Sequence, residues 1–414
     1  MNKKKIFNDP VYGFITIQSD TVFDIIEDPI FQRLRRIKQL GLTDLIYPGA
    51  LHTRFHHAIG AMHLMSKAIE SLRSKRIEIS DTESEALQLA ILLHDIGHGP
   101  FSHALESSLL HGVGHESLSF LLMKSLNKKL NGALDLSLRI FQNTYERKFF
   151  HQLVSSQLDM DRLDYLKRDS FFTGVSEGAI GLERIISMLN VVDDRIVVEQ
   201  KGLYSIENFL NARRLMYWQV YLHKTSVSAE KMLINTILRA KELRIMGKEL
   251  PATPELDIFL SSAINLESFQ TQPDLLQAFA KLDDYDIWGG IKHWQKSNDL
   301  ILSQLSTALL SRKLFRIQLS NEPLEKRKVE TIRKSVSKEF AVLKSDSRFL
   351  FSYGEVTNKA YIGEGQSINI LRKSGEVVDI ADAADLPNIK AMSKIVRKHY
   401  LCYPKNVYLR ESEN

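Results

Sequence analysis

The decapeptide ILLHDIGHGP, residues 91–100, ends an apolar run that begins at Ala86 and predicts a helix buried on most of its circumference. His94 and Asp95 stand side by side at the end of this run, and a second imidazole, His98, follows one turn later, where two glycines and a proline end the helix. A neutral imidazole beside a carboxylate in apolar surroundings is costly unless a cation lies between them, and a divalent metal is the simplest such cation. The alternative is a polar helix end with a hydrogen-bonded His94 and a solvated Asp95, because a His-Asp dipeptide alone is a weak signal.

The composition is that of an ordinary globular protein. The 414 residues, 44% hydrophobic and 25% charged, allow two or three domains. A net charge of +5 suits an anionic ligand but falls short of the strongly basic balance of a protein that coats DNA. The single cysteine, Cys402, excludes an intrachain disulfide and a thiolate metal cluster. His, Asp or Glu would therefore hold any metal, which favours Mn, Fe, Mg or Zn.

The sequence gives no sign of a membrane segment. The basic start, MNKKK, is not followed by an apolar run, and no stretch approaches the roughly 18 apolar residues of a membrane span. We therefore expect a cytoplasmic protein without membrane association, and leave open whether nucleic acid is a partner.

Hydrophobic periodicity predicts a mainly α fold, with an all-helical core over residues 1–310 and a small C-terminal α+β appendage over residues 311–414. The predicted core helices cover residues 24–39, 51–73, 86–93, 101–110, 115–126, 149–169, 205–243 and much of 254–310, with a turn at 288–290. A strand at 14–18 and a strand pair at 191–200 accompany them. In the appendage we expect strands at 314–319, 349–353, 368–371 and 377–380, and helices at 322–340 and 387–400.

Histidine and aspartate recur at helix positions that can converge on the His94–Asp95 pair. His57 and Asp161 are the further candidates, and with the pair they make a four-ligand N/O site with room for water. Each alone has another explanation, because His57 could be an exposed helix residue and Asp161 could pair with Arg162. Together, in this order, they indicate a metal site much more specifically.

Two further groups of side chains surround these candidates. The first follows the pair closely and suits proton delivery, since histidines change charge near neutral pH; it comprises His98, His103, Glu106 and His115. The second consists of two helical stripes with i, i+4 spacing: Asp161, Tyr165 and Asp169 beside Arg162, and Arg213, Tyr217 and Tyr221. Tyrosines at this spacing are either core packing or, with the arginines, the wall of a pocket for a phosphorylated nucleobase.

The chain resembles the HD-domain deoxynucleoside triphosphate triphosphohydrolase family over roughly residues 5–240, more than half its length. The matching segments are NDP at 8–10, FQRLRRIKQLG at 31–41, YPGA at 47–50, HTRFHH at 52–57, LHDIGHGPFSH at 93–103, HE at 115–116, DRLDYLKRD at 161–169 and YLHK at 221–224. Beyond residue 240 the likeness weakens.

The resemblance implies a role for each matching residue. The metal ligands would be His57, His94, Asp95 and Asp161. The catalytic residues would be His98 and His115, with Glu106 where the family usually has an acidic partner of the histidine. The phosphates would be contacted by Arg54, His103, Arg162, Tyr165 and Arg213. The deoxyribose would be surrounded by Gln39, Leu40, Asp169 and Tyr221, with Tyr221 crowding the 2′ position.

Some family members are activated by nucleotides at subunit interfaces. Four residues match that pattern, namely Lys5, Asn8, Gln32 and Arg35, whereas Glu27 stands where an aspartate is expected. The resemblance therefore implies a nucleotide activator and a homo-oligomer, a dimer or a tetramer. Family habit would give the appendage a part in assembly or regulation.

The implied activity is hydrolysis of deoxynucleoside triphosphates at the α-phosphorus, giving deoxynucleoside and intact triphosphate. One divalent transition metal (Fe, Mn or Zn) would occupy the HD site, and Mg would accompany the triphosphate. A rival hypothesis is an HD-type phosphodiesterase or pyrophosphohydrolase acting on (p)ppGpp, cyclic nucleotides or RNA ends; the deoxyribose residues argue against it. A second is a catalytically silent nucleotide- or nucleic-acid-binding regulator, which the four intact ligand positions disfavour.

Overall fold

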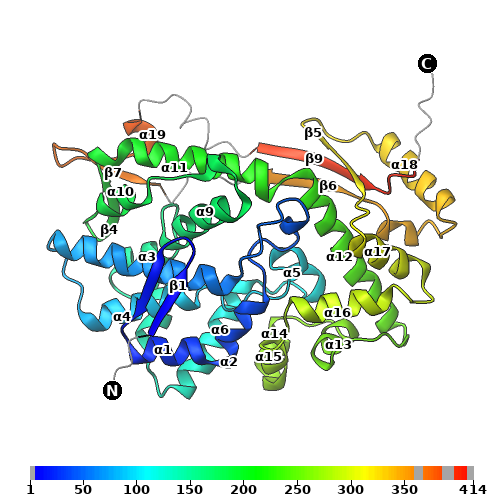
Figure 1. The fold of residues 1–414 in the computed structure, drawn as a ribbon, viewed down its shortest axis with the longest axis horizontal. Coiled ribbons are helices and arrows are strands. Elements are labelled where there is room, and N and C mark those ends of the chain that lie inside the picture. The colour runs from blue at the N-terminus through cyan, green and yellow to red at the C-terminus, as the bar shows by residue number, and fades with distance from the viewer. Residues whose placement is uncertain (1–4, 359–366, 385–395, 408–414) are drawn as a thin grey trace.

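The computed structural model describes residues 5–358, 367–384 and 396–407, and within them the mainly α prediction is confirmed (Figure 1). The α-helices are α1 (Asp20–Glu27), α2 (Pro29–Gln32), α3 (Arg54–Ser74), α4 (Asp81–Leu93), α5 (His103–Leu109), α6 (His115–Lys129), α7 (Asp135–Phe141), α8 (Lys148–Val154), α9 (Met160–Thr173), α10 (Leu182–Ser187), α11 (Leu203–Met216), α12 (Lys224–Ile245), α13 (Pro254–Ser261), α14 (Leu266–Thr271), α15 (Pro273–Phe279), α16 (Asp284–Trp294), α17 (Leu300–Leu310), α18 (Lys326–Glu339) and α19 (Ile380–Ala383). None of these helices has both the length and the apolar character that a membrane span requires.

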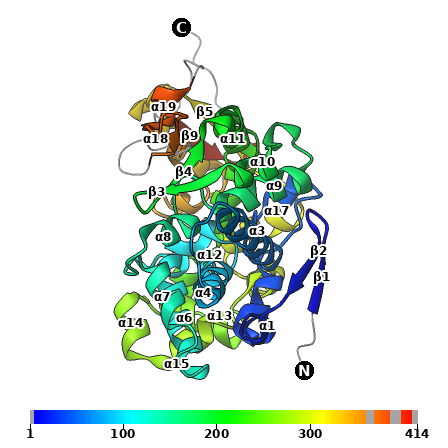
Figure 2. The same ribbon diagram turned by 90° about the vertical axis from the view of Figure 1, so that its left-hand side faces the viewer.

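The strands of the described residues form three small sheets. They are β1 (Lys5–Asp9), β2 (Gly13–Ile17), β3 (Leu189–Val192), β4 (Arg195–Glu199), β5 (Arg316–Ser320), β6 (Ser352–Asn358), β7 (Asn369–Leu371), β8 (Val377–Asp379) and β9 (Val396–Tyr403). The hairpin β1–β2 lies against α3 on the outside of the helical body (Figure 2). The other sheets have the strand orders β3-β4-β7-β8 and β5-β9-β6.

Helix α3 is the centre of the helical body and packs on α4 and on α9. Its buried side chains, among them Ala58, Ile59, Met62 and Met65, join one large core with the apolar run of α4. The tight approach to α9 requires Gly60, because a Cβ there would lie 2.1 Å from both Arg168 and Asp164. Helices α4 and α9, which are distant in sequence, therefore both lie against α3.

Two long helices expected from periodicity are broken by capping residues. The predicted helix over 24–39 ends at Glu27, because Asp28 caps the next helix at Pro29 and a 3-10 turn over Arg33–Arg36 follows. The predicted helix over 149–169 is divided into α8 and α9, and Asp159 caps α9 by accepting a hydrogen bond from the backbone of Arg162. Hydrophobic periodicity correctly predicted which helix faces are buried, but it wrongly predicted that each of these helices is continuous.

Three further expectations were wrong. The helix over 205–243 is interrupted by a π-helix, η5 (Tyr217–Tyr221), before α12 begins. The turn at 288–290 does not exist, since α16 runs through it and the ring of Trp294 fills the space beside Gly290. Of the final helix predicted at 387–400, residues 396–400 belong to strand β9, and 387–395 lie outside the described residues.

Candidate active site

The four predicted metal ligands meet where α3, α4 and α9 come together. Ligand atoms of His57, His94 and Asp161 lie within 4.8 Å of one another. Oδ1 of Asp161 is 3.1 Å from Nε2 of His57 and 3.5 Å from Nε2 of His94. Asp95 completes the group, with Oδ1 3.3 Å from Nε2 of His94 and Oδ2 3.7 Å from Nε2 of His57. Two imidazoles and two carboxylates thus face a common point.

The two imidazoles are prepared for a cation. In the described part of the chain, Nε2 of His57 and Nε2 of His94 are buried atoms without a hydrogen-bond partner. Their Nδ1 atoms are engaged instead, with the carbonyl of Ile91 at 2.5 Å from His94 and a carboxylate oxygen of Asp164 at 2.7 Å from His57. Metal-bound histidines typically engage their other ring nitrogen in this way, which directs the free nitrogen at the metal. The N/O donor set fits Mn, Fe or Zn.

The electrostatics of this cluster favour positive charge. Burial lowers the pKa of His57, but the carboxylates of Asp161 and Asp164 outweigh it and raise that pKa to about 10. Burial raises the pKa of Asp161, yet His57 and His94 hold it below its ordinary value. Carboxylates that keep a neighbouring imidazole protonated also attract a metal ion, which would displace that proton.

A chain of buried ion pairs supports His57 from behind. Asp164 accepts two hydrogen bonds from Arg168, both 3.0 Å long. Arg168 in turn donates to Asp9 at 2.8 Å, and Asp9 lies at the end of strand β1. Asp164 and Arg168 are completely buried and Asp9 almost so. The only sign of this support in the sequence is the i, i+4 spacing of Asp164 and Arg168, from which it was not predicted.

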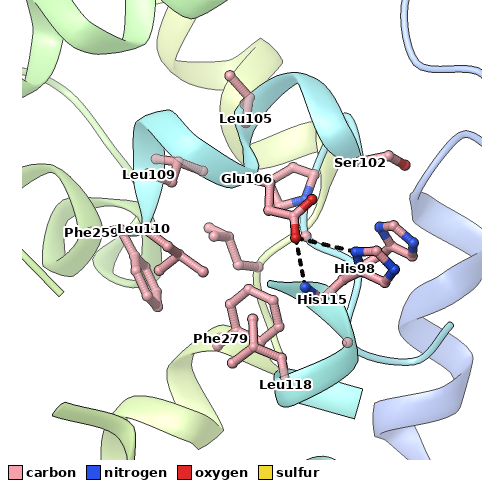
Figure 3. Close-up of a pocket in the computed structure, with 14 residues that line it drawn as sticks. His98, Ser102, Leu105, Glu106, Leu109, Leu110, His115, Leu118, Phe259 and Phe279 are labelled. Carbon is pink, nitrogen blue, oxygen red and sulfur yellow. Dashed lines mark hydrogen bonds and ion pairs between the residues drawn. The ribbon is translucent and has the colours of Figure 1, made fainter. Parts of the chain in front are cut away.

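A second group, Asp95, His98 and His115, lies beside the first and shares Asp95 with the four-ligand cluster. The rings of His98 and His115 are stacked, with centroids 3.9 Å apart and planes 13° apart. Glu106 on α5 faces them (Figure 3). Its Oε1 accepts a hydrogen bond from the backbone N–H of His115 at 2.7 Å and lies 3.2 Å from Nδ1 of the His115 ring. Burial and then the cation of Arg54 lower the pKa of His98 well below its ordinary value, so His98 is neutral at physiological pH.

Apolar side chains close the far side of this histidine pair. A small cavity of about 20 Å³, the space of a single water, lies behind the pair among leucines and phenylalanines (Figure 3). Gly97 permits the close approach of α6, since a Cβ there would lie 2.2 Å from the carbonyl oxygen of His115 and from the backbone nitrogen of Ser119. The pair is therefore shielded from bulk water on that side.

Of the residues predicted to contact the phosphates, one touches the metal cluster and two others hydrogen-bond the loop before α9. Arg54 is buried, hydrogen-bonds Asp95, and donates to Oγ of Ser102 at 2.9 and 2.7 Å, so it touches the metal cluster directly. Arg162 donates to the carbonyl of Ser156 at 2.5 Å, and Arg213 to Gln157 at 2.9 Å. The pKa of Tyr165 is raised to about 12, mainly by burial. The side chain of His103 lies outside the described part of the structure.

The predicted deoxyribose residues form a hydrogen-bonded group. Asp169 accepts from the hydroxyl of Tyr221 at 2.8 Å. Its other oxygen lies 2.7 Å from Nε2 of His52, a histidine to which the sequence analysis gave no role. The backbone of Gln39 donates to the carbonyl of His52 at 3.0 Å, and Leu40 packs against the main core.

The residues matched to the activator pattern lie near the β1–β2 hairpin. Arg35 donates to Gln32 at 2.8 Å and stacks over the ring of Phe55. Burial lowers the pKa of Arg35, and the charge of Glu27 opposes this. Lys5 and Asn8 are on strand β1.

Two family descriptions match the chain. The HD domain covers residues 54–169, and the HD associated region covers residues 180–261. A phosphohydrolase from Bacteroides thetaiotaomicron has a similar structure over its whole length and 97% of this chain, with a TM-score of 0.93 and 52% identity. The protein YwfO from Bacillus subtilis is 32% identical over 98% of this chain and 94% of its own.

A more distant likeness connects the chain to enzymes of named activity. A deoxynucleoside triphosphate triphosphohydrolase SAMHD1 homolog from Dictyostelium discoideum is 30% identical over 66% of this chain and 56% of its own length. The similarity to that enzyme thus covers part of each protein rather than either complete chain.

Proposed function

The chain belongs to the HD-domain phosphohydrolase family, and from this premise we propose that it hydrolyses deoxynucleoside triphosphates at the α-phosphorus to deoxynucleoside and triphosphate. The observation that carries the proposal is that the candidate metal cluster and the candidate proton-donating histidines lie next to each other. A His/Asp cluster with two unpartnered imidazole nitrogens lies beside the stacked His98–His115 pair. Asp169 of the Asp169–Tyr221 pair, which is matched to deoxyribose recognition, is on the same helix α9 as Asp161.

The metal would be held by His57, His94, Asp95 and Asp161. A divalent Fe, Mn or Zn bound there supplies Lewis acidity toward a phosphoryl oxygen and lowers the pKa of water. Mg would arrive with the triphosphate as part of the substrate. Asp164 and the carbonyl of Ile91 keep the two imidazoles in the tautomer that offers Nε2.

The remaining steps belong to the chain's own residues. Water attacks the α-phosphorus, and the bond from that phosphorus to the 5′ oxygen of the deoxynucleoside breaks. His115, with a quarter of its side chain exposed and Glu106 bound to it, donates the proton that the departing oxygen takes. His98 is the poorer donor of the pair, because its lowered pKa leaves it neutral. Arg54, Arg162 and Arg213 offset the charge of the triphosphate, an effect of several kcal/mol in comparable sites.

The family also contains other chemistries, so product analysis is the deciding experiment. Purified protein loaded with Mn²⁺ is incubated with each of the four dNTPs, with and without a second nucleotide. Free triphosphate supports the proposal. Pyrophosphate or a nucleoside monophosphate supports a phosphodiesterase or pyrophosphohydrolase of the kind that acts on (p)ppGpp, cyclic nucleotides or RNA ends. Tight nucleotide binding without turnover supports a catalytically silent regulator.

Asp95→Ala should remove bound metal and activity together, because Oδ1 of Asp95 lies 3.3 Å from Nε2 of His94 and 3.4 Å from Nε2 of His98. Metal content by mass spectrometry and turnover are measured on the same preparation. A variant that retains bound metal and turnover would refute the ligand assignment.

His115→Ala should retain the metal and lose about 10²–10⁴-fold in kcat, the usual contribution of a general acid. Leu118→Ala, in the same helix and beside the same cavity, is the matched control and should change kcat little. An unchanged kcat in His115→Ala would reject its role as the acid.

Nucleotide activation and assembly are a second part of the proposal. The contact between Gln32 and Arg35, with Glu27 and strand β1 nearby, supports a nucleotide site that a second subunit would complete. Size-exclusion chromatography with light scattering, with and without GTP or dATP, tests whether a nucleotide drives a dimer or tetramer.

A further inference from the structure

His52 is a buried histidine beside the proposed sugar pocket that the mechanism above does not use. It is 1% exposed and precedes α3. Its Nε2 lies 2.7 Å from Oδ1 of Asp169, while Oδ2 of Asp169 accepts from Tyr221 at 2.8 Å. Each oxygen of this carboxylate therefore has its own partner, and the carboxylate cannot rotate without breaking one of the two bonds.

The ring of His52 is itself fixed in place. It stacks on Phe172 with centroids 4.5 Å apart and planes 20° apart, and Phe172 follows Asp169 by one turn of α9. The backbone is tied to the segment before it, since Gln39 donates to the carbonyl of His52 and Arg54 donates to the carbonyl of Ile37. Helix α9 thus holds the imidazole, and the 37–39 segment holds the backbone that carries it.

Unpartnered polar atoms border this arrangement. Among the described residues, Oε1 of Gln39 and Nδ1 of His52 are buried without a hydrogen-bond partner. If Nε2–H of a neutral His52 donates to Asp169, Nδ1 is an acceptor. Buried polar atoms without partners are uncommon in native proteins, and at this place Gln39 offers an acceptor that a sugar hydroxyl can satisfy.

We propose that His52 is a positioning residue that sets the discrimination against ribonucleotides. This inference rests on the proposed function. His52 holds Oδ1 of Asp169, so Oδ2 stays on the Tyr221 hydroxyl and the tyrosine ring stays where it crowds the 2′ carbon. Without His52 the carboxylate turns, Tyr221 loses its acceptor, and space opens for a 2′-hydroxyl.

The test compares three substitutions that separate the ring from the hydrogen bond. His52→Phe retains a ring on Phe172 but has no donor, whereas His52→Gln retains an amide donor for Asp169. His151→Phe is the matched control, because it removes a comparable bond, 3.0 Å to the carbonyl of Ile140, from a histidine that belongs neither to the metal cluster nor to the Asp169–Tyr221 group. The measurements are kcat/KM for dATP, dGTP, ATP and GTP, and dissociation constants for dATP and ATP in EDTA.

His52→Phe should lower the dNTP/NTP ratio of kcat/KM about 10-fold or more, mainly through better use of ribonucleotides, in a site whose selectivity depends on hydrogen bonds. His52→Gln should restore most of the ratio, and His151→Phe should leave it unchanged. An unaltered ratio in folded His52→Phe would overturn the inference. If His52→Phe does not fold, His52→Asn replaces it, since its shorter amide cannot reach Asp169.

The binding measurements separate this inference from the proposed function. If wild type turns over no dNTP, the proposed function fails. The dissociation constants for dATP and ATP then decide whether His52 sets the discrimination against ribonucleotides. A preference for dATP that His52→Phe loses then supports the inference. Equal affinity of wild type for dATP and ATP overturns it.

Discussion

His57 illustrates how distant residues set the chemistry of one side chain. Its Nδ1 meets Asp164, which is paired with Arg168, which is paired with Asp9. The charges alternate along this buried chain, and removal of one partner leaves a charge uncompensated in a place where it cannot be solvated. The orientation of a metal ligand thus depends on a residue of the N-terminal hairpin.

Asp9→Asn should weaken metal binding by roughly 10–100-fold, the usual effect of losing a group that orients a ligand. The substitution removes the negative charge that balances Arg168, so Arg168 draws on Asp164 and loosens its hold on His57. Titration of the metal-free protein with Co²⁺, followed by its visible absorption, measures the affinity. Asp24→Asn, an exposed aspartate on α1, is the control. A lower melting temperature with unchanged Co²⁺ affinity would limit Asp9 to a packing role.

The element boundaries carry as much functional information as the elements. Two of the breaks in helices that periodicity predicted as continuous lie beside proposed site residues. Asp159 begins α9 two residues before Asp161, and the π-helix over Tyr217–Tyr221 ends at the tyrosine that binds Asp169. Periodicity reports which face is buried, but several residues in each stretch are able to cap a helix. Tertiary packing decides which one does, so the breaks were not predictable from the sequence.

Helix α4, which carries His94 and Asp95 at its end, should lose stability in acid through Glu83 at its start. Burial raises the pKa of Glu83, but hydrogen bonds from Ser80, Arg147 and Tyr145 outweigh this and lower it from 4.5 to about 2. A carboxyl with a depressed folded-state pKa stabilises the protein above pH 4.5, and this contribution is lost as the pH falls toward 2. Glu83→Gln should therefore melt below wild type at pH 7.

The melting temperatures of wild type and Glu83→Gln should converge between pH 4.5 and 2. Glu70→Gln is the control, since its exposed pair with Lys67 contributes little. A difference between wild type and Glu83→Gln that stays constant over this pH range would contradict the assigned cause.

At the scale of the whole molecule, the sequence predicted the helical class and the residues that the structure brings together at the cluster. It did so because those residues lie in short, specific segments such as HDIGH. It did not predict the partners of these residues, because His52 and Asp169, or Asp9 and Arg168, are more than a hundred positions apart. Nothing in local periodicity specifies such pairs.

The division of the chain at residue 310 into a helical core and a C-terminal appendage remains a prediction. One C-terminal sheet agrees with it and the other does not. Strand β7 pairs in parallel with β4 of the helical body, and Ile370 belongs to the main core. The sheet β5-β9-β6 contributes instead to a second, smaller core with α17 and α18. The C-terminal segment is therefore divided between the body and a cluster of its own.

The meeting of α3, α4 and α9 at one cluster predicts that a metal ion stabilises the whole molecule. The four ligands come from three helices and are assembled only in the folded chain, so an ion binds the folded state in preference to the unfolded one. At a free metal concentration 100 times the dissociation constant, such binding adds about 2.7 kcal/mol to the free energy of unfolding. Treatment with EDTA should lower the melting temperature, and Mn²⁺ or Zn²⁺ should restore it in a concentration-dependent way. Asp161→Asn should abolish that response; an equal response in the variant would mean that the ion binds elsewhere.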